Sequence, residues 1–212
     1  MQRLEDVRSK DGPNLAVSRW EPAGVPRGEI LLVHGYAEHM GRYEHVGDAF
    51  AAIGFRVTGL ELRGHGRSEG RRGHVARWSC YLEDVEAAVT LVGDPIFVAH
   101  SMGSLVVLDW LREHRAPAAV LSAPLLRPSV KVPRWKILAA RVLSRLIPTL
   151  PMANEIPPGQ VCRHPDVVAA YASDTLVFHV ATPRWYTEMT AATARVMRHA
   201  PTYTTPILCM YG

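Results

Sequence analysis

The residues best suited to covalent chemistry are those at positions 99–103, Ala-His-Ser-Met-Gly, which stand between an apolar run and a helix-forming run. A serine flanked by small residues two positions away is typical of a tight strand-to-helix turn that lifts the hydroxyl off a sheet. In such a turn the N–H of Met102 lies at the positive end of the helix, where it can stabilise an oxyanion. A serine that only caps the helix is the alternative. We predict that Ser101 is a nucleophile, with His100 and Gly103 in the wall of its site.

A second run that could take part in catalysis occupies positions 34–39. Its sequence is HGYAEH, and it comes directly after an apolar stretch. When a serine turn follows a later strand, the loop at this place supplies a second backbone oxyanion donor. We expect that donor to be the N–H of Tyr36, with His34 and Gly35 in the wall of the site. A simple His-Gly turn is the alternative.

A third run, RGHGRS at positions 63–68, contains two glycines that permit backbone conformations closed to other residues. A phosphate cradle is one interpretation of such a run. However, the sequence has no GxxxxGK[ST] pattern, and GxGxxG is absent from the first predicted strand-to-helix turn. We therefore predict a structural loop that borders the site.

Strands and helices must position these three runs, and the spacing of apolar residues around them predicts such elements. Apolar runs at positions 29–33, 55–60, 95–99 and 118–122 alternate with helical spacing at 43–53, 78–91 and 101–113. This alternation predicts a mostly parallel sheet with helices on both faces. Positions 4–9 and 15–20 flank an Asp-Gly-Pro turn and predict an antiparallel hairpin at one edge. A further helix is expected at 186–199 and a strand at 206–211.

The alternation breaks off after position 124, in a stretch rich in proline. We predict a core in two parts, residues 1–124 and 186–212, interrupted by a lid, residues 125–185, over the C-terminal end of the sheet. The lid contains a predicted helix at 134–147.

Taken together, the motifs resemble the monoacylglycerol lipase and lysophospholipase branch of the α/β-hydrolases. The serine turn matches that branch with Ala99 in place of the usual first glycine. The pattern HGxxEHxxRY at 34–43 and the pattern RGHGxSxG at 63–70 match it as well. Further matches lie at residues 72–75 (RGHV), at Tyr81 and Asp84, and in the lid at 166–184.

The resemblance implies an α/β-hydrolase fold and a serine esterase that acts on small lipid esters, with no metal and no organic cofactor. Ser101 would attack the ester carbonyl while the N–H groups of Tyr36 and Met102 hold the oxyanion. A histidine would take the serine proton, and an aspartate would orient that histidine. A peptidase of the same superfamily is the alternative. A serine at position 101 argues against epoxide hydrolases and dehalogenases, which use aspartate there.

The triad order in this fold is serine, acid, histidine, and the acid follows the strand predicted at 206–211. The sequence ends at Gly212, before both positions. Aspartates and histidines downstream of Ser101 fall on helix flanks or in the lid, and we do not expect them to substitute: Asp109, Asp166, Asp174, His114, His164, His179 and His199. We expect a fragment that lacks the C-terminal part of the fold and hydrolyses esters poorly. A truncated, noncatalytic lipid-binding protein is the alternative.

The predicted lid helix is amphipathic. Arg134, Arg141 and Arg145 lie along one face, and the other face is apolar, with Trp135, Leu138, Val142, Leu143 and Leu146. Such a helix either buries its apolar face against an acyl pocket or makes peripheral contact with a membrane surface.

Composition narrows the class of protein further. A charged share of 21% and a net charge of +4 without a Lys/Arg run give no footprint for nucleic acid. The three cysteines form no CxxC pair, which favours reduced thiols. The N-terminus has no apolar signal segment, so we expect a cytoplasmic protein. No pattern indicates an oligomeric state.

Overall fold

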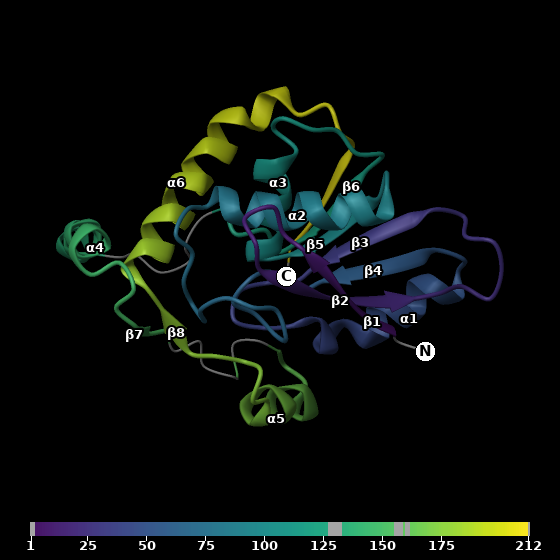
Figure 1. Ribbon diagram of the computed structural model, residues 1–212, viewed down its shortest axis with the longest axis horizontal. Coiled ribbons are helices and arrows are strands. Elements are labelled where there is room, and N and C mark those ends of the chain that lie inside the picture. The colour runs from purple at the N-terminus through teal and green to yellow at the C-terminus, as the bar shows by residue number, and fades with distance from the viewer. Residues whose placement is uncertain (1–2, 127–132, 155–158, 160–161, 212) are drawn as a thin grey trace.

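A seven-stranded sheet runs through the middle of the protein (Figure 1). The computed structural model describes residues 3–126, 133–154, 159 and 162–211. In sheet order the strands are β1 (Arg3–Arg8), β2 (Asn14–Trp20), β4 (Arg56–Leu60), β3 (Glu29–Val33), β5 (Ile96–His100), β6 (Ala119–Ser122) and β9 (Ile207–Met210). β1 pairs antiparallel with β2, and β2 antiparallel with β4, whereas the other pairings are parallel. The predicted mostly parallel sheet with a hairpin at one edge is confirmed.

Helices cover both faces of this sheet (Figure 1). One face carries α1 (Glu44–Ala52), which the 3₁₀ helix η1 (Met40–Tyr43) leads into. The other face carries α2 (Ser79–Val92), α3 (Met102–Trp110) and α6 (Pro183–His199), after which comes the 3₁₀ helix η3 (Ala200–Thr202). The continuous apolar run of β3 is explained by this double cover. Its Leu31 and Val33 pack on the α2 side, whereas Ile30 and Leu32 pack on the α1 side.

The start of α6 differs from the prediction by three residues. The helix begins at Pro183, where the hydroxyl of Thr182 accepts a hydrogen bond from the N–H of Trp185. Proline suits the first turn of a helix because its missing N–H would have no intrahelical partner there. The predicted start at position 186 was therefore too late.

The elements within the predicted lid (residues 125–185) lie at the C-terminal ends of the parallel strands (Figure 1). They are α4 (Arg134–Leu146), β7 (Met152–Ala153), α5 (Pro165–Ser173) and β8 (Val180–Ala181), with β7 and β8 paired antiparallel. The sequence predicted α4 but none of the other three. Parts of the predicted lid, residues 127–132, 155–158 and 160–161, lie outside the described residues. Within the described part of the chain, no helix combines the length and the apolar character needed to cross a bilayer.

Candidate active site

Ser101 stands at the sharp turn between β5 and α3. Its backbone has φ 48° and ψ −112°, a conformation that a side chain makes unfavourable. The turn is held by hydrogen bonds from the N–H of Ser101 to the carbonyl of Ser122 (2.9 Å) and from the N–H of Leu125 to the carbonyl of Ser101 (3.0 Å). The side chain of Ser101 forms no capping hydrogen bond to the helix, which argues against a simple helix cap. The strand-turn-helix geometry matches a nucleophile elbow.

Close packing beneath the turn depends on glycine. A Cβ added to Gly103 would lie 2.4 Å from the carbonyl oxygen of His34 and 2.6 Å from that of Val33. The first turn of α3 therefore rests directly on the backbone that leaves β3. Glycine at position 103 is buried under the elbow.

The loop after β3 faces the serine. A Cβ added to Gly35 would lie 3.2 Å from the Cβ of Ser101 and 3.1 Å from Cδ2 of His100. Three of the residues assigned to the site from the sequence thus meet at one point. The N–H groups of Tyr36 and Met102, the two predicted oxyanion donors, have no acceptor among the residues that the structure describes. Both remain available to a ligand beside Ser101.

Glu38 shapes this loop from within. Its Oε1 accepts hydrogen bonds from the N–H of Gly35 (2.6 Å) and the hydroxyl of Tyr43 (2.7 Å), and its Oε2 accepts one from Nε of Arg42 (3.2 Å). Burial, and then the Glu38 carboxylate, raises the pKa of Tyr43 well above its usual value, so the phenol stays protonated and donates. No role for Glu38 was predicted from the sequence, although its place three residues after Gly35 was the available signal.

His34 supports the loop from below. Its Nδ1 donates to the carbonyl of Gly35 (2.7 Å), and its Nε2 accepts from the N–H of Leu62 (3.1 Å). Burial lowers the pKa of His34, so the ring stays neutral and its tautomer is fixed. The ring of His34 is fully buried. His100, by contrast, is half-buried, with Nδ1 3.4 Å from the hydroxyl of Ser122.

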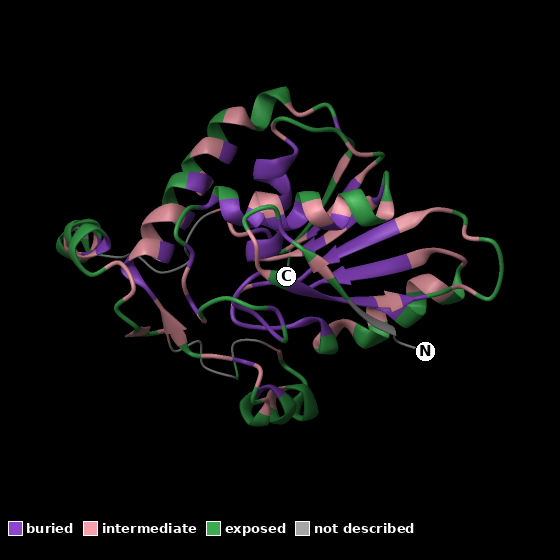
Figure 2. Ribbon diagram, viewed as in Figure 1, coloured by how far each residue is buried: buried purple, intermediate pink, exposed green. Residues whose placement is uncertain are grey.

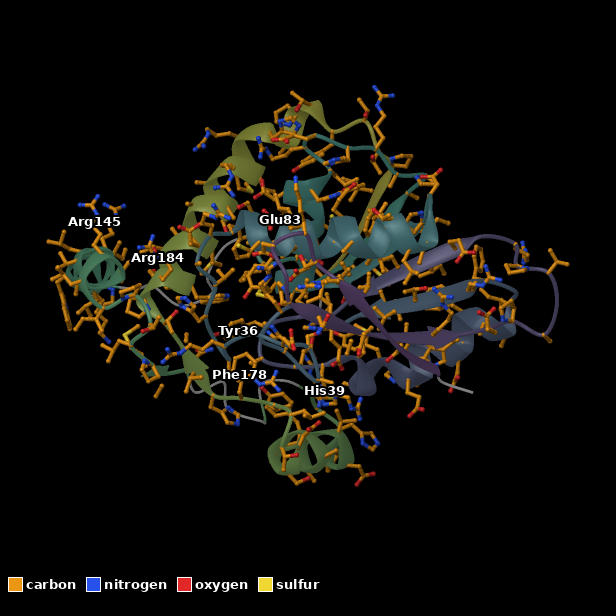
Figure 3. The ribbon with its side chains drawn as sticks, viewed as in Figure 1. Tyr36, His39, Glu83, Arg145, Phe178 and Arg184 are labelled. Atoms are coloured by element: carbon orange, nitrogen blue, oxygen red, sulfur yellow. The ribbon has the colours of Figure 1, made fainter. Side chains whose placement is uncertain are left out.

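Tyr36 also connects the loop to the lid. Its hydroxyl donates to the carbonyl of Val180 in β8 (2.7 Å), and its ring centroid lies 3.9 Å from that of Trp185. Phe178 lies beside it (Figure 3), with its ring edge toward Tyr36 at a centroid distance of 5.5 Å. One residue therefore carries a predicted oxyanion donor on its backbone and a lid contact on its side chain.

The loop at 63–68 has structural partners. Arg63 forms ion pairs with Asp84 (2.6 Å) and Asp11 (2.6 Å), and its N–H donates to Asp84 (3.0 Å). The hydroxyl of Ser68 accepts a hydrogen bond from the N–H of Ala16 (2.9 Å). These contacts agree with a structural loop and occupy the guanidinium of Arg63.

No described residue supplies a base to the serine. The hydroxyl of Ser101 forms no hydrogen bond within the described part of the chain. Asp109 is buried between Arg112 and Arg195 (2.9 and 2.6 Å), and His114 stacks on Trp110 at a centroid distance of 4.2 Å. The remaining downstream candidates also have other neighbours: His164 with Asp166, Asp174 with His39, His179 with Tyr171, and His199 with Tyr203.

The geometry can be compared with known proteins. A family model described as "Serine aminopeptidase, S33" matches residues 24–212. The chain is 35% identical over 210 residues to a monoacylglycerol lipase of Mycolicibacterium smegmatis, which covers 95% of this chain and 75% of that protein. It is 30% identical over 221 residues to the human monoglyceride lipase, covering 100% of this chain and 73% of that protein. The crystal structure of a Paleococcus ferrophilus monoacylglycerol lipase superposes with a TM-score of 0.85 at 29% identity, over 93% of this chain and 77% of that chain. The chain therefore belongs to the family described as "Serine aminopeptidase, S33" and is an α/β-hydrolase of the monoglyceride lipase type.

Proposed function

We propose that this chain belongs to a serine hydrolase that cleaves carboxylic esters of lipids, of the monoacylglycerol or lysophospholipid type. The observation that carries the proposal is Ser101, held at φ 48° against Gly35 with two unpartnered N–H groups nearby. A hydroxyl beside two backbone donors suits attack on an ester carbonyl, because the donors stabilise the oxyanion that attack creates. The names of the bacterial and human relatives point to the same class of substrate.

In the proposed reaction the Oγ of Ser101 bonds to the carbonyl carbon, and the carbonyl oxygen takes the negative charge opposite the N–H groups of Tyr36 and Met102. Expulsion of the alcohol leaves an acyl group on Ser101, and water then releases the acid. A histidine must carry the proton from serine to the alcohol, and no described imidazole forms a hydrogen bond with the Ser101 hydroxyl. We propose that this histidine and its acid lie beyond the present sequence.

A chain without the base should turn over slowly, because loss of a triad member leaves only the catalysis due to oxyanion donors and binding. We expect the 212-residue chain to hydrolyse p-nitrophenyl butyrate at a rate roughly 10³-fold or more below that of an intact esterase. Ser101→Ala should lack the acyl adduct that mass spectrometry finds on the wild type, and any rate it keeps should be the part that the oxyanion donors and binding supply.

Ser104→Ala is the matched control, because Ser104 lies on the same helix but is buried and donates to the carbonyl of Ala99. It should keep the wild-type rate. An acyl adduct that still forms in Ser101→Ala would show that Ser101 is not the nucleophile. A Ser101-dependent rate equal to that of intact esterases would show that the chain already contains a base.

The family description favours a second reaction, cleavage of a peptide bond next to a free amino terminus. Amides need a protonated leaving group more than esters do, so the missing base would affect this reaction even more. Parallel assays with p-nitrophenyl butyrate and leucine p-nitroanilide distinguish the two. Faster Ser101-dependent release from the anilide would establish the peptidase. A chain that binds monoacylglycerol yet shows no Ser101-dependent rate would be the noncatalytic lipid-binding protein.

We also propose that α4 makes peripheral contact with a membrane surface. Its apolar side chains are exposed instead of packed on the core (Figure 2): Trp135 by 67%, Leu138 by 63% and Leu146 by 73%. The opposite side of α4 packs on α6 through Ala140 and through Ser144, whose hydroxyl lies 2.9 Å from that of Thr187. Exposed basic residues flank the apolar stripe, as Arg145 does in Figure 3. An exposed apolar stripe beside basic groups is the pattern of an interfacial helix.

The cellular location stays a prediction. All three cysteines are free thiols, as expected of a protein in a reducing compartment. Fractionation of the source cells with an antibody against the chain tests the cytoplasmic location.

A further inference from the structure

The oxyanion loop (residues 34–43) is attached to a segment of the lid far away in the sequence, which we call the lid exit segment (residues 171–182). Tyr36 contacts this segment through its hydroxyl, as described above. The carbonyl of Ala37 accepts a hydrogen bond from the N–H of Phe178 (3.3 Å). The guanidinium of Arg42 lies over the ring of Tyr171, 4.8 Å from its centroid. The loop and the segment are therefore joined along their whole length.

The shortest side-chain contact between them joins His39 to Asp174. Nδ1 of His39 accepts a hydrogen bond from the N–H of Gly41 (3.2 Å), so the proton of the neutral ring is on Nε2. That Nε2–H donates to Oδ2 of Asp174 at 2.7 Å, and His39 is only 6% exposed. The other oxygen of Asp174 accepts from the N–H of Leu176 (2.9 Å), which fixes the chain just after α5. Asp174 thus ties the start of the lid exit segment to the loop.

The loop needs this external support because its middle is strained. Ala37 has φ 64°, a left-handed conformation that costs about 1 kcal/mol for a residue with a Cβ. Such a backbone persists only where surrounding contacts determine it. On the core side, Glu38 holds Gly35, and Oε1 of Glu61 accepts from the N–H of Met40 (3.1 Å). On the other side, the lid exit segment contacts the loop through Tyr36, Ala37 and His39.

We propose that Asp174 is a positioning residue for ester cleavage, which acts through His39 to hold the oxyanion loop so that the N–H of Tyr36 faces Ser101. The proposal rests on the proposed function, because it assigns the Tyr36 N–H to the oxyanion. It goes further in placing one determinant of that geometry in the lid. Displacement of the lid exit segment would then expose the site around Ser101 and would also let the Tyr36 N–H move away from its position facing Ser101.

The first test is amide hydrogen exchange of the chain by NMR, comparing the wild type with Asp174→Ala and Asp174→Asn. Removal of the carboxylate should speed exchange at Gly35 and Gly41 by about 10-fold and shift the Tyr36 amide resonance, with strand β5 unchanged. Asparagine keeps one acceptor oxygen, so its effect should be smaller than that of alanine. It is also the variant to use if alanine does not fold.

Asp166→Ala is the matched control, because Asp166 lies on the same α5 helix with its side chain 92% exposed and contacts only His164 among the described residues. It should leave the loop amides at wild-type values. Equal exchange at Gly35 and Gly41 in all variants, or an equal change in Asp166→Ala, would overturn the proposal.

The second test is the Ser101-dependent hydrolysis of p-nitrophenyl butyrate. Asp174→Ala should lower kcat by about 10-fold while KM changes less than twofold, because the oxyanion donor acts in the transition state and not in substrate binding. Faster loop exchange with an unchanged kcat would overturn the positioning role. The exchange result does not depend on which residue is the nucleophile, so a failure of the proposed function shows separately, in Ser101→Ala.

Discussion

Ser101, Ala37 and Ala123 are the three non-glycine residues with positive φ in the described part of the chain. All three lie around the candidate site: one in the oxyanion loop, one at the elbow and one directly after β6. Ala123 is held by a hydrogen bond from its N–H to the carbonyl of Met210 (2.8 Å). The backbone strain is therefore concentrated where the chemistry is proposed, and close packing of the neighbours maintains it.

The close packing around the elbow can be tested by substituting Gly103. Gly103→Ala should destabilise the protein by about 2–3 kcal/mol, because the new methyl would press on two backbone carbonyls that cannot turn aside. Urea unfolding followed by circular dichroism measures the change. Gly24→Ala is the control, since a Cβ there meets nothing within 4 Å, and it should stay within about 0.5 kcal/mol of the wild type. Equal midpoints for the two variants would contradict this account of the elbow.

At the residue scale, the sequence was most informative where chemistry depends on neighbours in the chain. The serine turn and the oxyanion loop each follow an apolar strand, and parallel strands bring their C-terminal ends to one edge. That reasoning brought Ser101, Gly35 and His100 together. It could not identify Asp174, because the contact with His39 spans 135 residues. Nor could it show that the ring of His34 is fully buried, since burial of a loop side chain depends on what packs beneath it.

At the scale of elements, long periodic segments were predictable and short ones were not. The strands that are covered on both faces show as continuous apolar runs, so β3 was found with its observed bounds. The two-residue strands β7 and β8 carry no periodicity, and pairing between distant segments alone defines them. Helix α5 lies in a proline-rich stretch and starts at Pro165, a residue that usually signals a loop.

The exposed apolar surface of helix α4 allows the proposed membrane contact to be tested. Trp135→Ala combined with Leu138→Ser should weaken co-sedimentation with anionic liposomes by about 10-fold or more, because each exposed apolar side chain contributes roughly 1–2 kcal/mol on burial in lipid. Raised salt should weaken binding of the wild type as well, since Lys136, Arg141 and Arg145 are exposed.

The control for this experiment is Val25→Ser, which removes an apolar side chain that is 93% exposed in the loop between β2 and β3. It should bind liposomes like the wild type. If the double variant also bound like the wild type, or if no chain bound, membrane contact through α4 would be ruled out.

At the scale of the whole molecule, Arg63 links three distant parts of the chain. Its guanidinium contacts Asp11 beside the β1–β2 turn and Asp84 in α2, and it also bonds to the hydroxyl of Ser9 (2.9 Å). The edge hairpin is thereby attached to the helical layer. The hydrogen bond from Arg63 lowers the pKa of Asp11 from 3.8 to about 2.

The lowered pKa of Asp11 predicts how the free energy of unfolding depends on pH. A carboxyl group whose pKa is lower in the folded state stabilises the fold fully above its unfolded pKa of 3.8 and loses that contribution as the pH falls toward 2. Asp11→Asn should therefore lower the urea midpoint at pH 7, and the difference from the wild type should shrink between about pH 4 and 2.

Asp48→Asn serves as the reference, because Asp48 is exposed on α1 and has no ion pair with any residue that the structure describes. Its midpoint should follow the wild type at every pH. A difference between Asp11→Asn and wild type that stays constant down to pH 2 would refute the coupling to Arg63.

The lid is attached to the molecule in two separate ways. The half that contains α5 and β8 is bonded to the oxyanion loop, whereas α4 is held by α6, where Nη2 of Arg184 donates to the carbonyl of Ser144 (2.7 Å). Among the described residues, no hydrogen bond joins α4 to the oxyanion loop. Substitution of the outer surface of α4 is therefore insulated from the reacting atoms. Substitutions on that surface should therefore leave the oxyanion loop in place, whereas substitutions in the α5 half should disturb it.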